Sequence, residues 1–210
     1  AITANAATPM ADKQAPSFYR YKVGDVQVTV ISDGVNTFPL GDSFVLNAKK
    51  DEVAAALEKA NMPKDKVSIQ FGPLVINSGG KLIVLDTGNG PGAFASSKGA
   101  VGQFATNMAA AGFDPKNVDM VVISHFHGDH INGLLNAEGT SAFTNAEVLV
   151  PSVEWKYFMD DGEMAKQTGE RMPGVFKNAR RVFEAGLQKK VTPYEWGKEV
   201  VPGLLAVETA

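Results

Sequence analysis

The sequence predicts a single α/β domain, and three observations support this prediction. Short apolar runs such as "LIVL" and "MVVI" have the length and residue types of buried strands. Stretches with helical spacing alternate with them, and no internal repeat or linker divides the chain. A length of 210 residues, with 44% hydrophobic and 20% charged residues, suits one globular domain.

The first half of the chain predicts strands and one helix. "DVQVTVISDG" (25–34) alternates apolar and polar residues as a strand does, and it ends in an Asp-Gly turn. "DEVAAALEKA" (51–60) is rich in helix formers and opens with acidic residues, as helices do. "GPLVINSGGKLIVLDTG" (72–88) predicts two strands joined by a hairpin turn at its Ser-Gly-Gly.

The second half continues the alternation. Apolar residues at helical spacing from Val101 predict a helix that stops at Gly112, and "MVVIS" and "AEVLV" predict buried strands. Ser152 is the predicted N-cap of the helix "VEWKYFM". The remaining predicted elements are two strands, 190–196 and 203–209, and before them a helix with the apolar stripe Val175, Phe176, Ala179, Val182, Phe183 and Leu187.

Composition excludes several classes of function. The chain has no cysteine, so disulfides, thiolate catalysis and cysteine-bound metals are absent. The net charge of −3, without a basic stripe, argues against nucleic acid as a partner, and no apolar run is long enough to cross a membrane. We expect residues 1–16 to be a disordered or extended tail, or the start left after removal of a signal peptide. We therefore expect a periplasmic or secreted protein, with the cytoplasm as the alternative.

All three histidines of the chain lie in "VVISHFHGDHING" (121–133). His125 and His127 are two residues apart after a strand, which places both imidazoles on the same side of an extended backbone. Asp129 and His130 follow on a turn at Gly128. Imidazole nitrogen and carboxylate oxygen are good donors for zinc and similar divalent ions.

A short loop cannot easily wrap four donors around one ion. Two adjacent ions, each bound by two of these donors and by further ligands elsewhere, are the easier arrangement. The alternative is a polar loop or an adventitious metal patch, which the His-x-His-x-Asp-His spacing disfavours. We therefore expect His125, His127, Asp129 and His130 to converge at the end of the "MVVIS" strand.

"SHFHGDH" resembles the signature of the metallo-β-lactamase fold superfamily, and "LIVLDTG" and "GFDPKNVDMVVISHFHGDHINGL" resemble its neighbouring passages. "FYRYKVGDVQVTVISDG" and "FTNAEVLVPSVEWKYF" resemble the branch with methyl parathion hydrolase and related lactonases or phosphotriesterases. The resemblance covers most of residues 17–210 and implies an αββα sandwich, represented here by the N-terminal half and the start of the second half.

The resemblance also implies a ligand set. His125 and His127 would bind the first metal, and Asp129 and His130 the second. The family supplies a further His to each metal and a bridging Asp, and the first of these His usually lies just after a strand like "GLLAVET", where this sequence ends. We therefore expect residues 17–210 to form an incomplete domain of a chain of roughly 280 to 300 residues, a size that suits one large domain.

The implied function is a metal-dependent hydrolase. Two divalent ions, Zn or alternatively Mn, Fe or Co, would hold a hydroxide that attacks an ester, lactone or phosphotriester, and Asp129 would be essential to catalysis. β-Lactamase, thioesterase and nuclease activities are the open alternatives within the superfamily. Two alternatives do not involve hydrolysis: an oxidoreductase of the sulfur dioxygenase or flavo-diiron type, and an inactive metal-binding fragment. The expected partner is a small-molecule substrate, with a homodimer as a further expectation.

Six further residues have an expected place near the site or in the core. Asp86 follows the strand in "LDTG" and would accept the second N–H of a ligand histidine, the alternative being a simple turn residue. Asp33 has the same two interpretations. Phe158 and Phe176 would line a substrate pocket, as aromatics of this segment do in the branch, whereas Trp155 and Phe183 are predicted core residues.

Overall fold

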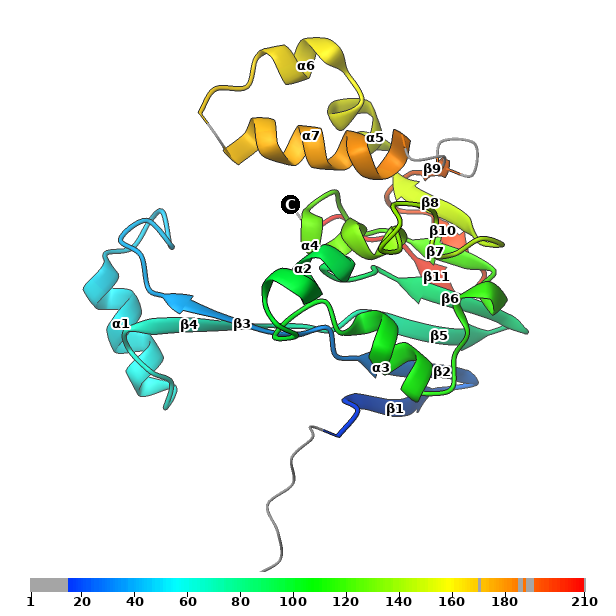
Figure 1. Cartoon of the computed structure of the whole chain (residues 1–210), viewed down its shortest axis with the longest axis horizontal. Coiled ribbons are helices and arrows are strands. Elements are labelled where there is room, and N and C mark those ends of the chain that lie inside the picture. The colour runs from blue at the N-terminus through cyan, green and yellow to red at the C-terminus, as the bar shows by residue number, and fades with distance from the viewer. Residues whose placement is uncertain (1–14, 170, 185–186, 188–190, 210) are drawn as a thin grey trace, which may run out of the picture.

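The computed structural model describes residues 15–169, 171–184, 187 and 191–209. The predicted N-terminal tail, residues 1–16, falls outside these ranges except for its last two positions. The predicted α/β architecture is confirmed, because a large mixed sheet packs against helices of the same chain (Figure 1).

The main sheet has seven strands in the order β1-β2-β5-β6-β7-β8-β9. The strands on the β1 side pair antiparallel, and the pairs β6–β7, β7–β8 and β8–β9 are parallel. Their bounds are β1 Phe18–Val23, β2 Val26–Ile31, β5 Leu74–Ser78, β6 Lys81–Leu85, β7 Met120–Val122, β8 Glu147–Pro151 and β9 Val191–Tyr194.

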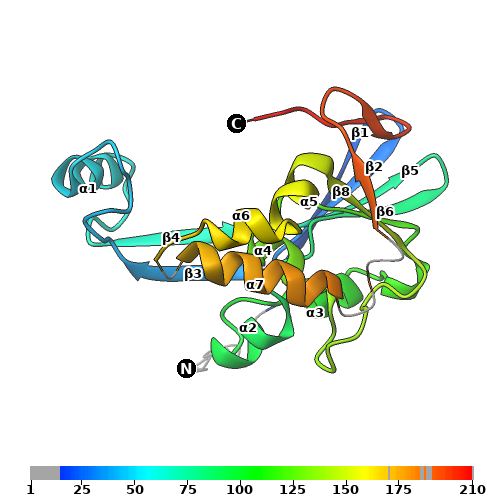
Figure 2. The same cartoon turned by 90° about the horizontal axis from the view of Figure 1, so that it is seen from above.

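Two core clusters lie on opposite faces of this sheet. Successive strand residues alternate between them, so that Val121 faces the larger cluster and Val122 the smaller one. The larger cluster packs against α3 (Phe104–Ala110), α5 (Ser152–Phe158) and α7 (Arg171–Glu184). The smaller cluster packs against a hairpin of β10 (Glu199–Val201) and β11 (Leu204–Leu205), which covers the other face (Figure 2).

An arm projects from the body of the molecule (Figures 1 and 2). The antiparallel pair β3 (Gly34–Pro39) and β4 (Lys66–Phe71) forms its stem, and α1 (Lys50–Lys59), which has no buried residue, lies at its tip. The sequence predicted the helix at 51–60 but neither strand. β3 carries no apolar alternation, and the alternation of Val67, Ile69 and Phe71 with polar residues in β4 was missed.

The remaining elements are short and lie around the larger cluster. They are α2 Gly90–Ser96, α4 Gly128–Ile131, α6 Asp161–Ala165 and the 3₁₀ turns Pro115–Asn117 and Asn132–Leu134. The structure corrects two local predictions. Ser152 is the first helical residue of α5 and not its N-cap, a position that Pro151 occupies without a side-chain bond. The strand predicted at 203–209 is reduced to the two residues of β11.

Candidate metal centre

The carboxyl ends of four neighbouring parallel strands meet at one edge of the main sheet. Asp86 directly follows β6, and Ser124 and His125 follow β7. Glu154 lies in the first turn of α5, which begins where β8 ends, and Tyr194 is the last residue of β9. Open α/β sheets bind ligands at this edge, so the strand order itself gathers these polar groups.

The structure brings the three imidazoles and Asp129 together, as their spacing predicted. The ring of His125 has its centroid 3.9 Å from that of His130 and 4.7 Å from that of His127. Asp129 Oδ2 lies 3.3 Å from His130 Nε2. All four side chains are partly exposed, so an ion from solvent can reach them.

Phe126 explains why the two flanking imidazoles share one side of the loop. Its side chain is fully buried in the larger core cluster, with its ring 4.5 Å from that of Phe183. Its backbone N–H donates to Glu154 Oε2 at 2.8 Å. With the middle residue held in this way, His125 and His127 are directed to the opposite side of the extended chain.

Asp86 joins the ends of β6 and β7. One carboxylate oxygen accepts from the backbone N–H of Ser124 and the other from the Ser124 hydroxyl, both at 2.8 Å. The second oxygen also lies 2.8 Å from Nδ1 of His130. Asp86 has a positive φ of 58°, a conformation that Asp and Asn adopt more readily than most other residues.

This network selects the nitrogen that each ring presents. Because a carboxylate only accepts, the proton between Asp86 and His130 belongs to Nδ1 of the ring. The Ser124 hydroxyl gives its proton to Asp86, so it can accept from Nδ1 of His125 at 3.1 Å. Nε2 is then the nitrogen of His125 and His130 that is left with a lone pair for a metal.

Thr87 holds the far side of the loop. Its backbone N–H and its hydroxyl both donate to the carbonyl oxygen of His130, at 2.9 and 2.8 Å. This approach requires glycine at position 133, because a Cβ there would lie 2.0 Å from the carbonyl oxygen of Thr87. Gly128, predicted to bend the chain, has no positive φ and begins the short helix α4.

The pKa values of the cluster shift in different directions from one residue to the next. Burial lowers the pKa of His125, and the neighbouring imidazoles lower it further. A hydrogen bond from His130 lowers the pKa of Asp129. Burial disfavours the charged form of His130, but hydrogen bonds to Asp129 and Asp86 outweigh it and raise the pKa of His130 to about 9. A metal bound here would therefore displace a proton.

The four donor side chains are of types that bind divalent metal ions, and they are arranged as two pairs. Across residues 15–169, 171–184, 187 and 191–209, no three His, Asp or Glu side chains form a group that could hold one metal ion. His125 with His127, and Asp129 with His130, each bring two donors together. Catalytic zinc usually has three protein ligands, so each pair would need a further donor.

Two predicted pocket residues lie in the core instead. Phe158 and Phe176 are 4% and 0% exposed, and their rings are 4.8 Å apart within the larger cluster. This burial contradicts the prediction that they contact a substrate, because Phe158 on α5 and Phe176 on α7 both pack into the larger core cluster. Phe183 is a core residue as predicted, and Trp155 packs partly buried against the same cluster.

Asp33, which had two interpretations, is completely buried. The side chain of Asp33 binds Asn89, which lies 56 residues further along the chain. One oxygen accepts from the backbone N–H and the side-chain amide of Asn89, at 2.7 and 2.8 Å, and the other from the backbone N–H of Phe104 at 2.8 Å. Asp33 thus ties the loop after Asp86 to the start of α3. Its carboxylate partners are Asn89 and Phe104 and not a histidine, so it is not part of the histidine cluster.

Sequence reasoning missed Ser124, Thr87, Glu154 and Tyr194. The first two stand beside identified residues, in "SHFH" and "LDTG", and this adjacency was the available signal. Tyr194 donates its hydroxyl to the carbonyl oxygen of Ile123 at 2.9 Å, and burial raises its pKa. Tyr194, Glu154 and His125 border a hollow of about 670 Å³ between the sheet edge and residues 200–209.

Comparison with known proteins places this arrangement in context. The family model described as "Metallo-beta-lactamase superfamily" matches residues 74–205, more than half of the chain. No curated protein sequence matches the chain as a relative.

Solved structures match over most of the chain. A dizinc quorum-quenching lactonase, AidC, in complex with the product N-hexanoyl-L-homoserine, has a TM-score of 0.77 at 21% identity, covering 88% of this chain and 63% of its own. The hydrolase AbOPH of the beta lactamase superfamily has a TM-score of 0.76 at 26% identity, covering 90% and 64%. A probable metal-dependent hydrolase from Staphylococcus aureus has a TM-score of 0.66 at 22% identity, covering 87% and 64%. The chain thus spans less than two thirds of the length of each.

Proposed function

Because the chain belongs to the metallo-beta-lactamase superfamily, we propose that it is a hydrolase of small esters that uses divalent metal ions. We propose lactones and phosphotriesters as its substrate classes. A dizinc lactonase among the similar structures supports the first, and the branch resemblance of the sequence supports the second. The observation that carries the proposal is the convergence of three imidazoles and Asp129 at the carboxyl ends of parallel strands.

We propose that His125 and His127 hold one ion and Asp129 and His130 the other. Two divalent ions, when bound, supply Lewis-acid chemistry that lowers the pKa of water and stabilises negative charge on an oxygen. The chain's own residues prepare for them. Asp86 holds Nδ1 of His130, and Ser124 holds Nδ1 of His125, so that the Nε2 atoms keep their lone pairs and their direction.

The backbone of the loop is tied independently of these side chains. Glu154 accepts from the N–H of Phe126, and Thr87 donates twice to the carbonyl of His130. The imidazoles therefore need little reorganisation when an ion binds. Such preorganisation is what a catalytic metal site requires of its supporting residues.

Hydrolysis and metal content of the purified protein test the proposal together. Zinc, manganese, iron and cobalt are quantified per chain, and activity is measured on an N-acyl homoserine lactone, a nitrophenyl phosphotriester and a β-lactam. We expect bound divalent metal and turnover of the lactone or the phosphotriester, abolished by Asp129→Ala with the circular dichroism spectrum unchanged. The matched control is Asp25→Ala in the exposed turn between β1 and β2.

Three results would oppose the proposal. Full activity in Asp129→Ala would remove this residue from the mechanism. Retained turnover with one metal per chain would leave the two-ion arrangement without support. Bound iron with oxygen consumption and no hydrolysis would favour an oxidoreductase of the same superfamily.

A further inference from the structure

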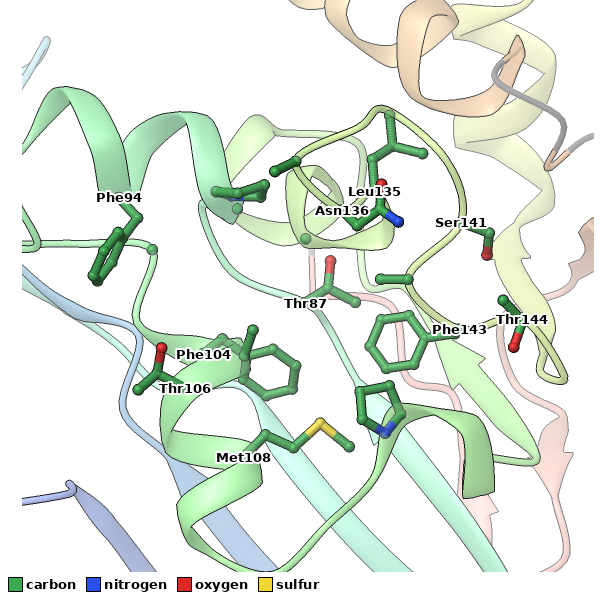
Figure 3. A pocket seen from close by; sticks show the side chains of 18 of the residues that line it. Thr87, Phe94, Phe104, Thr106, Met108, Leu135, Asn136, Ser141, Phe143 and Thr144 are labelled. Atoms are coloured by element: carbon green, nitrogen blue, oxygen red, sulfur yellow. The ribbon is translucent and has the colours of Figure 1, made fainter.

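The arm exposes apolar side chains that the body of the molecule would bury. In the body, Phe104 and Phe143 lie around one small space beside Thr87 (Figure 3) and are at most 3% exposed, so little of them is left for a partner to contact. In the arm, Leu46 before α1 is 95% exposed, and Met62 after α1 is 39% exposed. A group of exposed apolar residues at the tip of a projecting arm indicates a surface for a partner.

The helix α1 itself has no buried residue, and it lies at the far end of the arm, away from the main sheet (Figures 1 and 2). Its ten residues span about 15 Å, and a helix of this length is marginal in water unless one of its faces is packed. Val53, Ala54 and Leu57 are half-buried, whereas Ala55 and Ala56 are exposed. The outer face of α1 is therefore open to a partner.

Asp51, Ala55 and Lys59 form a stripe along this outer face, because residues four apart are neighbours on a helix surface. The stripe has an acid at its start, a small residue at its centre and a base at its end. Asp51 and Lys59 are roughly 12 Å apart along the helix axis, too far to pair with each other. Neither has an ion-pair partner among the described residues, whereas Lys50 in the same helix pairs with Asp42.

The stripe is complementary to a second copy of itself. A twofold axis at Ala55 places the second α1 antiparallel to the first, so that Asp51 of each copy faces Lys59 of the other and the two Ala55 side chains meet. Alanine at the crossing lets the two helices approach closely. The start of one helix then lies beside the end of the other, which brings Leu46 of one copy and Met62 of the other to the same end of the contact. We propose that α1 and these flanking residues form the interface of a homodimer, with the two arms paired antiparallel about Ala55.

Charge favours a second copy as the occupant of this surface. Residues 34–71 contain five lysines and five acidic residues and so have no net charge, whereas the whole chain carries −3. Two arms therefore meet without net repulsion. The helix dipole also favours an acid at the start of a helix and a base at its end, but it does not account for exposed apolar residues at both ends of α1. Because a stable interface buries roughly 1,200 Å² or more, which two ten-residue helices alone do not supply, these apolar residues belong to the contact.

Sedimentation equilibrium of the purified protein tests the proposal, and we expect a dimer in reversible exchange with the monomer. Ala55→Glu would set two carboxylates against each other at the twofold axis, and it should raise the dissociation constant of the dimer by roughly a hundredfold or more. Glutamate is a good helix former, so the circular dichroism spectrum should stay unchanged. The matched control is Ala109→Glu in α3, which is also exposed and adds the same charge. It should leave the dissociation constant within about twofold, as surface changes generally do.

An exchange of charges tests the antiparallel order of the two helices. Asp51→Lys should raise the dissociation constant by roughly tenfold, because lysines then face each other at both ends of the interface. Lys59→Asp should have a similar effect for the same reason. The double variant restores opposite charges across the interface, so it should dimerise more tightly than either single variant. These differences should shrink in high salt, which screens exposed charges.

Three outcomes would overturn the proposal. The first is a monomer at every protein concentration measured. The second is a dimer that Ala55→Glu leaves intact, since the interface would then lie on another exposed surface, such as the edge strand β1. The third is a double charge variant that dimerises no better than the single variants. The arm holds none of the candidate metal ligands, so Ala55→Glu should keep its metal content, and the dimer is tested independently of the proposed function.

Discussion

Asp33→Ala should destabilise the protein, because Asp33 holds the loop after Asp86 and the start of α3 together. The side chain of Asp33 is fully buried and accepts three hydrogen bonds, two from backbone amides, of Asn89 and Phe104, and one from the side chain of Asn89. Alanine would leave the two amides without an acceptor. A buried donor left unpaired costs about 1–3 kcal/mol, so we expect a loss of roughly 2–6 kcal/mol in the free energy of unfolding.

The surroundings prevent an easy repair of this loss. Gly88 packs so closely that a Cβ on it would lie 2.5 Å from Cγ of Asp33, and glycine itself has no side chain that could replace the carboxylate. Asp33→Asn should show an intermediate loss. Its amide keeps one acceptor oxygen but turns two N–H donors toward groups that are themselves donors.

Urea unfolding followed by circular dichroism measures these losses. The midpoint should fall for Asp33→Ala while the slope of the transition stays constant, which shows that stability changed and not the denatured state. Asp25→Ala, in an exposed turn, should change stability by less than about 0.5 kcal/mol. A loss that small at Asp33 as well would refute the account, since it would mean that the amides find other partners.

Three further outcomes are expected. Phe176→Ala should lower the free energy of unfolding by about 3–5 kcal/mol, because Phe176 is a core residue and not a pocket residue. Zinc affinity, measured by competition with a chelator, should stay unchanged. Weaker zinc binding with no loss of stability would contradict this prediction. Glu154→Ala should weaken zinc binding about tenfold, because it releases the N–H of Phe126. Glu154→Gln keeps an acceptor oxygen and should retain most of the zinc affinity. If the two variants bind zinc equally well, Glu154 has no positioning role. Hydrogen bonds from the Lys81 ammonium and from a backbone amide lower the pKa of Asp119, so the stability that Asp119 adds is present above its unfolded pKa and lost as the pH falls through its lower folded value. Asp119→Asn should therefore destabilise at pH 7 and destabilise less as the pH falls below 3.8; an effect that does not shrink toward acid pH would count against the linkage.

The position of the histidine cluster could be predicted because it depends on local rules. Residues two apart after a strand face the same way, and the buried "MVVIS" run located the strand. The contact of Asp86 with a histidine was expected from the family resemblance, and the structure explains it, because Asp86 and the histidine loop follow neighbouring parallel strands. Residues that follow neighbouring parallel strands lie at the same edge of the sheet, and an alternation of strands and helices predicts such a sheet.

Other contacts depend on tertiary distances that no local pattern encodes. Glu154 lies 28 residues from the amide that it accepts from, and nothing in "PSVEWKYF" distinguishes it from a surface glutamate in the first turn of a helix. The apolar stripe of α7 predicts that one face is buried, but it does not say whether that face meets the sheet or a pocket. The family resemblance placed Phe176 in a substrate pocket, whereas the structure buries it in the core.

The contacts around the histidine loop divide into two sets with different consequences. Thr87, Glu154 and Tyr194 bind backbone atoms of the loop, each from a different neighbouring segment. Asp86 and Ser124 bind the Nδ1 atoms of the rings. The first set fixes where the loop runs and the second fixes how the rings of His125 and His130 are turned, so both rings are positioned by the protein alone. In the metal site that we propose, an ion would therefore bind without having to order the loop, which favours its affinity.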